Sequence, residues 1–290
     1  MKILLLGGNG YLGSKAVHAL VNRGHSLFCA VRAGADLSRL QDIAETITFI
    51  SCSDEVLEKT LKNQRFDLVL NMACSYGRGK DSGNTVLESN LMFPLRVLAW
   101  AAQYNVPKFL TIGTSLPENL NQYSFTKESF GRFGKFYAAE FGMDFIHVKL
   151  EMLYGGDEPE DRFLPDMVNK MLRGEEVAVT LGTQHRDIIA VADAVRGIVR
   201  IVEADLHGYR EVPLGTGIAP SIAEILDFIR KETGERALIH YGAVPMRKNE
   251  PDCVADIQLL NELFTEENGW TPLFWQEGLR SMIKDIKEAL

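Results

Sequence analysis

Short apolar segments alternate with helical patterns throughout the first 150 residues of the chain. The apolar segments lie at 2–7, 27–31, 48–50, 67–72, 108–113 and 144–150. The helical patterns lie between them, at 11–23, 54–63, 85–104 and 122–141. Strands that are joined by helices pair in parallel, and a parallel sheet is covered by helices on both faces. The alternation therefore predicts an α/β fold with a Rossmann-type doubly wound parallel sheet.

The pattern loosens after residue 150, and the tail contains segments with glycine, proline and tryptophan that are typical of loops. Further helices are predicted near 162–173, 190–204 and 221–233, further strands near 177–180 and 209–214, and loops in the tail. We therefore expect a dinucleotide-binding core at 1–154, to which the 190–204 helix returns. Residues 155–290 are expected to form mainly a smaller C-terminal α/β lobe that binds the substrate.

The segment GGNGYLG follows the first predicted strand and opens the first predicted helix. Glycines at this spacing allow a tight turn, close approach of the backbone to a pyrophosphate, and packing of the helix on the sheet. The helix N-terminus then offers unpaired N–H groups to the phosphates. The predicted cofactor contacts in this loop are Gly7, Gly10, Tyr11, Leu12 and Gly13. The alternative is an ordinary turn between a strand and a helix.

The end of the second predicted strand decides which dinucleotide fits. An NAD site places Asp or Glu there to bond the ribose 2′-hydroxyl. Here the position is Val31, and Arg32 follows it. A guanidinium attracts a 2′-phosphate, so NADP(H) is predicted, with Arg32 as a contact. The alternative is NAD, with Arg32 solvated and Asp36 on the ribose.

Tyr123 and Lys127 are four residues apart on the helix predicted at 122–141, and therefore share one face of it. A nearby ammonium favours the phenolate form of a tyrosine, whose ordinary pKa is about 10. Such a pair can exchange protons near neutral pH. Tyr-x-x-x-Lys alone is a weak signal, because it also occurs by chance on surface helices.

Composition excludes several other classes of protein. The chain has 290 residues, a net charge of −8 and a pI near 5.4, which argue against nucleic-acid binding by phosphate neutralisation. The apolar run ILLL is too short for a signal peptide or a membrane span. The four cysteines show no CxxC and no metal-ligand spacing, so we expect reduced thiols, no metal and a cytoplasmic protein.

These features together resemble the extended short-chain dehydrogenase/reductase superfamily, also called the NAD-dependent epimerase/dehydratase family. Three later segments are similar to its motifs in order: KLEMLYGG, RDIIAVADAV and NGWTPLFWQEGL. Within the superfamily, the chain is similar to the abequose and paratose synthases, which are C4-ketoreductases of CDP-linked sugars. The segments that carry this narrower likeness are VRAGADLSRL, GTSLPENLNQYSFTK, KLEMLYG, RDIIAVAD and YGAVPMRKNEP.

The resemblance implies a catalytic set of Tyr123, Lys127 and Thr114, with Ser115 as the rival to Thr114 for the hydroxyl role. It adds Asn71, Ala73 and Asn90 as cofactor contacts. Arg186 and Arg247 would hold the substrate diphosphate, unless each forms an ordinary surface salt bridge. Phe163, Val179 and Thr180 would line the base pocket. It also implies a homodimer through the helices at 85–104 and 122–141. The second of these carries four aromatic residues that are predicted to be exposed: Phe130, Phe133, Phe136 and Tyr137.

The resemblance leaves three functions open. The first is NADPH-dependent reduction of the C4 keto group of a nucleotide-activated 6-deoxysugar. The second is a nucleotide-sugar 4-epimerase with tightly bound NAD, which the missing acid at Val31 disfavours. The third is a non-catalytic NADP-binding sensor. A 4,6-dehydratase is disfavoured because Ser115 and Leu116 replace its Asp-Glu pair. The chain departs from the family pattern at Lys149, Met152 and Gly156, and around Asp54.

Overall fold

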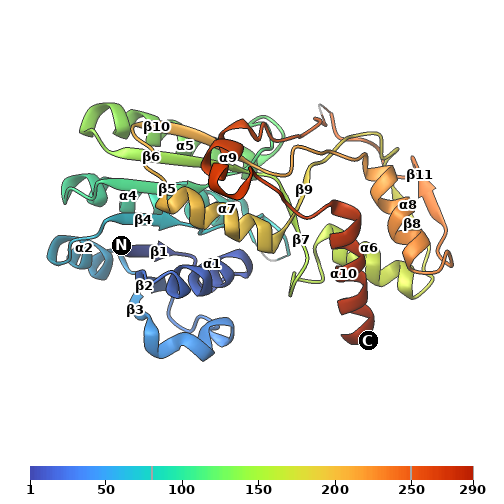
Figure 1. Cartoon of the computed structure of the whole chain (residues 1–290), viewed down its shortest axis with the longest axis horizontal. Coiled ribbons are helices and arrows are strands. Elements are labelled where there is room, and N and C mark those ends of the chain that lie inside the picture. Colours follow the sequence, from blue (N-terminus) through green and yellow to red (C-terminus); the bar gives the residue numbers. More distant parts are fainter. Residues whose placement is uncertain (80, 249, 290) are drawn as a thin grey trace. The chain divides into compact units, whose positions relative to one another are not determined.

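The computed structural model describes residues 1–79, 81–248 and 250–289 (Figure 1). Two compact units divide the chain: one contains residues 1–150 and 195–212, and the other contains 151–194 and 213–290. The boundary falls four residues before the predicted one, and 195–212 belongs to the first unit. No helix of the described residues is long and apolar enough to cross a membrane.

A seven-stranded sheet forms the centre of the first unit, in the order β10-β6-β5-β4-β1-β2-β3. Its strands are β1 (Lys2–Leu6), β2 (Ser26–Val31), β3 (Thr48–Ser51), β4 (Leu68–Asn71), β5 (Lys108–Ile112), β6 (Asp144–Leu150) and β10 (Tyr209–Leu214). Neighbouring strands from β3 to β6 run parallel. The chain leaves β1 toward β2 and β3 on one side and returns to β4, β5 and β6 on the other. This is a doubly wound sheet with its switch point between β1 and β4, so the predicted fold class is confirmed.

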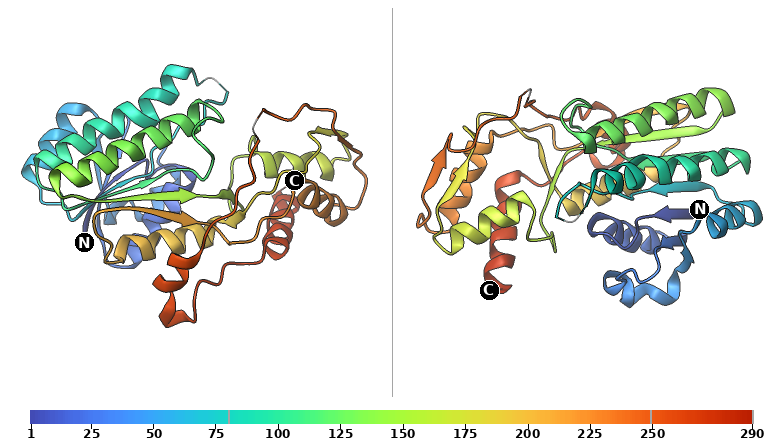
Figure 2. Two further views of the ribbon diagram at one scale, coloured as in Figure 1. Left: turned by 90° about the horizontal axis from the view of Figure 1, so that it is seen from above. Right: turned by 180° about the vertical axis from the view of Figure 1, so that it is seen from behind.

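Helices cover both faces of this sheet (Figure 2). They are α1 (Tyr11–Asn22), α2 (Asp54–Asn63), α3 (Gly83–Leu87), α4 (Phe93–Gln103), α5 (Gln122–Phe141) and α7 (Val191–Glu203). A π-helical turn (Glu88–Met92) joins α3 to α4, and a 3₁₀ segment (Ser38–Thr46) follows β2. Leucines of α2 and α4 and Phe130 of α5 share one core with the sheet, while α1 and α7 lie on the other face. Phe130 is therefore buried, contrary to the prediction that it lies on the surface.

The second unit has its own core. Two small parallel sheets pair β7 (Met152–Tyr154) with β9 (Ile188–Ala190), and β8 (Val177–Val179) with β11 (Ile239–Tyr241). Its helices are α6 (Phe163–Leu172), α8 (Ile222–Glu232), α9 (Gln258–Leu263) and α10 (Trp275–Ala289), with a 3₁₀ turn at Thr265–Glu267. Apolar side chains of α6, α8 and α10 pack with β7, β8 and β9. The tail, predicted as loops, thus contains a helix of 15 residues.

Candidate active site

The loop between β1 and α1 and the first turn of α1 each require glycine at one position. Gly7 has a φ of +78°, and a Cβ atom there would lie 2.7 Å from the backbone nitrogen of Ala73. A Cβ atom on Gly13 would lie 2.1 Å from the carbonyl oxygen of Gly7. The loop therefore packs directly against the segment that follows β4, at the switch point of the sheet where open α/β folds bind ligands.

The first turn of α1 fits the pyrophosphate of a dinucleotide. Gly10 is the N-cap residue and offers no side-chain cap, and the first turn carries no acidic residue. The first amides of a helix lack partners within it, and the helix dipole favours an anion there. Tyr11 is buried and Leu12 is half-buried. The cradle thus has the shape and polarity that NAD or NADP requires.

The segment after β2 carries the residues that are predicted to select the cofactor. Arg32 is exposed. Asp36 accepts a hydrogen bond from the Ser38 amide at 2.9 Å, and hydrogen bonds from Ser38 hold the pKa of the Asp36 carboxyl below its usual value. Lys15 Nζ and the Arg39 guanidinium carbon lie 5.6 and 6.0 Å from the centre of the Tyr11 ring. The sequence did not point to Lys15 or Arg39, because they belong to separate elements and both approach the Tyr11 ring only in the folded structure.

Lys127 ties the helix α5 to the sheet. Its ammonium donates to the carbonyl oxygens of Ala73, at 3.0 Å, and Ile112, at 2.9 Å. Only 4% of the residue is exposed, and this burial lowers the pKa of Lys127, because an apolar interior disfavours the charged form. An ammonium has three donors, so two bonds to carbonyls leave it able to donate to a ligand as well.

Tyr123 lies one turn before Lys127 and is half-buried. A capping box fixes the start of its helix, because Asn121 Oδ1 accepts from the Ser124 amide at 2.9 Å and Ser124 Oγ accepts from the Asn121 amide at 3.2 Å. The Tyr123 ring stacks on Tyr76, with the ring centroids 5.0 Å apart. Tyr76 had no sequence signal, because it lies in a loop without periodicity.

Thr114 follows β5 at the carboxyl edge of the sheet and is buried. Its Oγ1 accepts from the Leu116 amide at 3.2 Å, and a hydroxyl that accepts in this way can still donate its proton to a ligand. Ser115 donates its backbone N–H to the Leu150 carbonyl at 3.0 Å. The start of the short 114–123 connection is thus held by the ends of β5 and β6.

The two predicted asparagines shape the segment after β4. Asn71 Nδ2 donates to Thr111 Oγ1 at 3.0 Å, and its Oδ1 accepts from the Ala73 amide at 3.2 Å. Asn90, in the π-helical turn, bonds both backbone groups of Ser75 at 2.8 Å and donates to Thr126 Oγ1 at 3.3 Å. The Asn90 amide therefore holds a loop in place, and its role as a direct cofactor contact stays a prediction.

In the second unit, Arg186 is buried and its guanidinium binds protein groups. It pairs with the carboxylate of Glu250 and donates to the carbonyls of His185 and Pro251. The guanidinium thereby anchors Glu250 and Pro251, and its predicted bond to a substrate phosphate stays untested. Arg247 is exposed, as is appropriate for a ligand contact.

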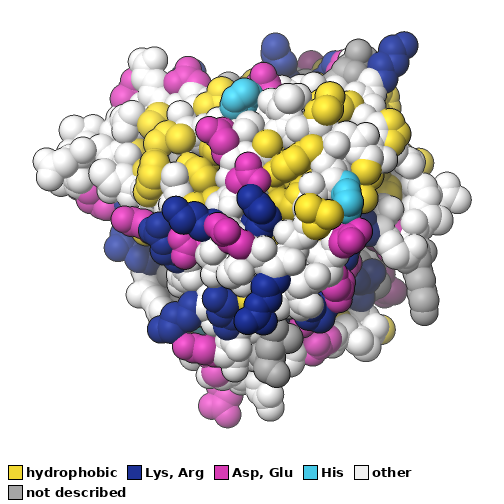
Figure 3. Space-filling view, turned by 90° about the vertical axis from the view of Figure 1, so that its right-hand side faces the viewer, with side chains coloured by type: hydrophobic (Ala, Val, Ile, Leu, Met, Phe, Trp, Pro, Cys, Tyr) yellow, Lys and Arg dark blue, Asp and Glu magenta, His cyan; other side chains and the backbone are white. Residues whose placement is uncertain are grey.

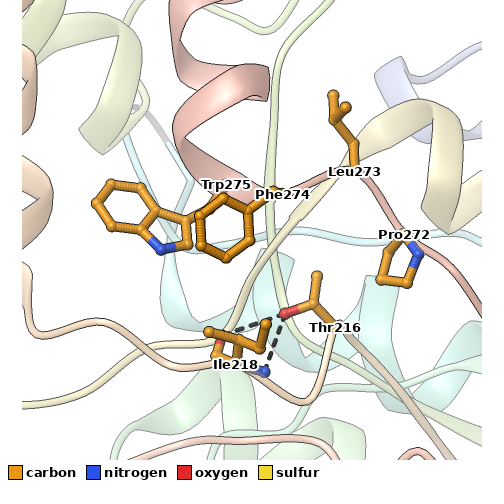
Figure 4. A pocket seen from close by; sticks show the side chains of 6 residues that line it. All are labelled: Thr216, Ile218, Pro272, Leu273, Phe274 and Trp275. Carbon is orange, nitrogen blue, oxygen red and sulfur yellow. Dashed lines mark hydrogen bonds between the residues drawn. The ribbon is translucent and has the colours of Figure 1, made fainter.

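The predicted base-pocket residues differ in their surroundings. Phe163 and Val179 belong to the apolar core of the second unit. Thr180 Oγ1 accepts from the Gly182 amide at 3.3 Å. A small pocket of this unit lies elsewhere, at the turn after β10 and the start of α10 (Figure 4). It is lined by Thr216, Ile218, Pro272, Leu273, Phe274 and Trp275.

The Asp187 carboxylate holds the turn after β10, which includes the pocket residue Thr216. It accepts from the amides of Thr216 and Gly217 at 2.9 and 2.8 Å, and from the Thr216 hydroxyl at 2.6 Å. It also accepts from the Ala255 amide at 3.2 Å. The RDIIAVAD segment thus contributes a buried structural anchor at its second residue. Among the described residues, no three His, Cys, Asp or Glu side chains gather as metal ligands.

Figure 3 shows apolar side chains lying among acidic and basic ones on the face that it presents. The second unit exposes Leu181, Leu238, Tyr241 and Val244. Scattered apolar side chains of this kind are common on soluble domains, and they assign no further site.

Curated enzymes that are named for nucleotide sugars are similar to the chain over most of its length. CDP-abequose synthase from Salmonella muenchen is 24% identical over 292 residues, which cover 97% of each chain. UDP-glucose 4-epimerase from Corynebacterium glutamicum is 25% identical over 98% of this chain and 94% of its own. Both likenesses run almost from end to end.

Solved structures share the fold over the whole chain. The UDP-glucuronic acid 4-epimerase of Bacillus cereus, solved with UDP-glucuronic acid and NAD, has a TM-score of 0.84 at 23% identity and full coverage of both chains. The UDP-glucose 4-epimerase of Thermotoga maritima, solved with UDP-glucose, has a TM-score of 0.83 at 22% identity, covering 100% of this chain and 99% of its own. The profile of the NAD dependent epimerase/dehydratase family matches residues 3–212. The glycine loop, the doubly wound sheet and this match together show that the chain belongs to the NAD dependent epimerase/dehydratase family, in its extended short-chain dehydrogenase/reductase form.

Proposed function

We propose that the chain reduces the C4 keto group of a nucleotide-activated 6-deoxysugar, with CDP as the favoured nucleotide and NADPH as the reductant. The observation that carries this proposal is Lys127. Its buried ammonium binds the carbonyls of Ala73 beside the glycine loop and of Ile112 at the end of β5, with Tyr123 one turn away. The likeness to CDP-abequose synthase over nearly the whole chain supports the sugar class.

Thr114, Tyr123 and Lys127 have different roles in the proposed reduction. Thr114 donates its hydroxyl proton in a hydrogen bond to the carbonyl oxygen and so orients the ketone. When bound, NADPH supplies a hydride to the carbonyl carbon. Tyr123 gives its phenolic proton to the oxygen as negative charge develops there, and Lys127 stabilises the resulting phenolate. A proton from solvent then restores Tyr123, which balances the reaction as ketone plus hydride plus proton to alcohol.

Two features favour reduction over the other reactions of the fold. Ser115 and Leu116 follow Thr114, so the acid-base pair of a 4,6-dehydratase is missing at those positions. The cations Arg32, Arg39 and Lys15 favour a 2′-phosphate, and therefore a cofactor that enters with its hydride. A 4-epimerase instead retains NAD and recycles the hydride.

The test follows nicotinamide absorbance while the purified protein is mixed with NADPH and 4-keto-6-deoxysugars linked to CDP, dTDP, UDP or GDP. We expect stoichiometric NADPH loss with one of them and a reduced sugar as product. Tyr123→Phe should lower kcat by about 10²–10⁴-fold. Tyr137→Phe, a matched change on the same helix, should leave kcat within about twofold. No NADPH loss, with NAD released on denaturation, would instead establish an epimerase. No loss and no bound cofactor would leave a sensor.

Cofactor choice is tested by binding alone. Arg32→Ala should weaken NADPH binding about tenfold and leave NADH binding unchanged, because a charge-assisted bond to the 2′-phosphate is lost. Arg65→Ala removes an equally exposed arginine just beyond α2 and should change neither affinity. Equal binding of NADH and NADPH by the wild-type protein would contradict the assignment. The measurement is quenching of protein fluorescence by each nucleotide.

A further inference from the structure

We infer that Tyr76 is a positioning residue for Tyr123: its ring forms the platform that holds the proton-donating phenol in one orientation. The inference rests on the proposed function. It assigns a role to a residue that neither the glycine loop nor the Tyr-x-x-x-Lys pair includes. The rings of Tyr76 and Tyr123 are stacked, with centroids 5.0 Å apart and planes inclined by 28°.

An exposed tyrosine is ordinarily free to change rotamer, and 40% of Tyr76 is exposed. The backbone of the preceding residue, however, is tightly held. The neighbouring Ser75 is buried, and the Asn90 side chain bonds both its N–H and its carbonyl at 2.8 Å. Ser75 Oγ also donates to Asp81 Oδ2 at 2.6 Å. The loop therefore presents the Tyr76 ring from a fixed base.

The same loop is joined to α5 at three successive points. Lys127 donates to the Ala73 carbonyl, Asn90 joins Ser75 to Thr126, and Tyr76 stacks on Tyr123. Each contact on α5 lies within one turn of the Tyr123–Lys127 pair. The π-helical turn at Glu88–Met92 carries Asn90, and such turns are frequent at functional sites. These contacts therefore fix the distance between the loop and the part of α5 that carries Tyr123.

A ring that stacks on Tyr123 restricts the rotation of the Tyr123 side chain. The orientation of a catalytic group affects the rate of the reaction more than the affinity for the substrate. Loss of the platform should therefore lower kcat and leave KM and NADPH binding nearly unchanged. A residue that binds substrate directly would show the opposite division. The hydroxyl of Tyr76 plays no part in stacking, so phenylalanine should replace tyrosine without loss.

The chain contains a matched control on the same helix. Tyr137 and Phe141 form a second ring pair with centroids 5.1 Å apart, inclined by 32°. Phe141 lies 18 residues after Tyr123, about 27 Å along the helix, and 56% of it is exposed. Phe141→Leu thus removes a comparable ring contact far from the proposed site.

The experiment compares Tyr76→Leu, Tyr76→Phe and Phe141→Leu for kcat, KM and NADPH binding. We expect Tyr76→Leu to lower kcat about tenfold with KM within about twofold, and the other two variants to match the wild type. A raised KM at unchanged kcat in Tyr76→Leu would overturn the inference in favour of a substrate contact. Equal losses in Tyr76→Phe would overturn it in favour of a role for the hydroxyl.

A spectroscopic readout separates this inference from the reaction itself. In protein labelled with 3-fluorotyrosine, the ¹⁹F resonance of Tyr123 is identified by its absence in Tyr123→Phe. The ring current of Tyr76 should displace that resonance, so Tyr76→Leu should shift it and Phe141→Leu should not. An unmoved resonance would overturn the stacking, whatever the enzyme reduces. If the wild-type protein consumes no NADPH but Tyr76→Leu still shifts the Tyr123 resonance, the proposed function is overturned. Tyr76 then only holds the Tyr123 ring in place.

Discussion

His147 lies on β6 with both ring nitrogens buried, and neither has a hydrogen-bond partner among the described residues. Two glycines make room for it: a Cβ atom on Gly113 would lie 2.2 Å from Nε2, and one on Gly131 would lie 2.4 Å from Nδ1. Burial, with smaller contributions from Lys149 and Lys127, lowers the pKa of His147 to about 3. The imidazole is therefore neutral in the folded protein at physiological pH.

This neutral histidine should make the fold sensitive to acid. An unfolded chain binds a proton at His147 below about pH 6.5, whereas the folded chain does so only near pH 3. Stability therefore falls as pH drops from 6.5 toward 3, by about 1.4 kcal/mol for each unit. Between pH 7 and pH 5 the wild type should lose about 2 kcal/mol more than His147→Gln, measured by urea unfolding. Equal losses in both proteins would show that another group causes the acid sensitivity.

Single residues were the least predictable part of the site. Tyr123, Lys127 and Thr114 stand in short motifs and could be named from the sequence. Arg186 could not be interpreted fully, because its partner Glu250 lies 64 residues away and no local pattern joins them. Tyr76 depends on a stack between two elements, which a sequence does not show.

Helix α5 shows how an element is fitted to the sheet. Gly131 and Gly134 are buried one turn apart, and a Cβ atom on Gly134 would lie 2.1 Å from the Phe145 ring. Phe109 stacks on Phe145 at 5.5 Å and Phe130 meets it edge-on at 5.8 Å. The ring therefore cannot move aside, and glycine permits the helix to approach the strand closely.

Gly134→Ala should consequently destabilise the protein, although alanine is the better helix former. We expect a net loss of about 2 kcal/mol, because overpacking outweighs a propensity gain of up to about 1 kcal/mol. Glu140→Ala, an exposed change on the same helix, should stay within about 0.5 kcal/mol of the wild type. The cost of Gly134→Ala should shrink in a Phe145→Leu background, and an undiminished cost there would refute the packing explanation. Urea unfolding measures the wild type, the three single variants and the double variant.

Elements with clear periodicity were predicted well. The ranges 54–63, 122–141 and 144–150 agree with α2, α5 and β6 to the residue. The prediction of one continuous helix at 85–104 was wrong, because a π-helical turn at Glu88–Met92 interrupts it. A single extra residue in one turn does not change the apolar spacing enough to be seen in the sequence. Helix α10 had a signal in its buried Trp275, Leu279, Met282 and Ile283, but Pro272 and Gly278 directed the interpretation toward a loop.

At the scale of the whole molecule, each unit has its own hydrophobic core. The first unit contains the glycine loop, Thr114 and the Tyr123–Lys127 pair, and the second contains Arg186 and Arg247. The predicted division at residue 154, which rested on the loss of strand–helix alternation, lies four residues after the first boundary between the units. It assigned the return of the chain to the 190–204 helix, whose residues from 195 on lie in the first unit together with part of β10.

The last expectation concerns assembly. The resemblance to the extended short-chain dehydrogenases implies a homodimer through the helices now seen as α4 and α5. On α5, Phe133 and Phe136 are exposed, the latter by 57%, and Met92 is exposed just before α4. Apolar side chains exposed on α5 and just before α4 favour contact with a second copy, since a twofold axis would pair each apolar face with itself.

Sedimentation equilibrium should therefore find a dimer, and Phe136→Glu should weaken it at least a hundredfold, because a carboxylate would be buried without a partner. Leu238→Glu places the same charge on an equally exposed apolar site in the second unit, and should leave the dimer intact. A monomeric wild type would contradict the expectation outright. A Phe136→Glu protein that remains dimeric would move the interface away from α5. Because Phe136 lies 13 residues beyond Tyr123 on the same helix, a dimer that closes over α5 would also stiffen the element that carries the proposed proton donor.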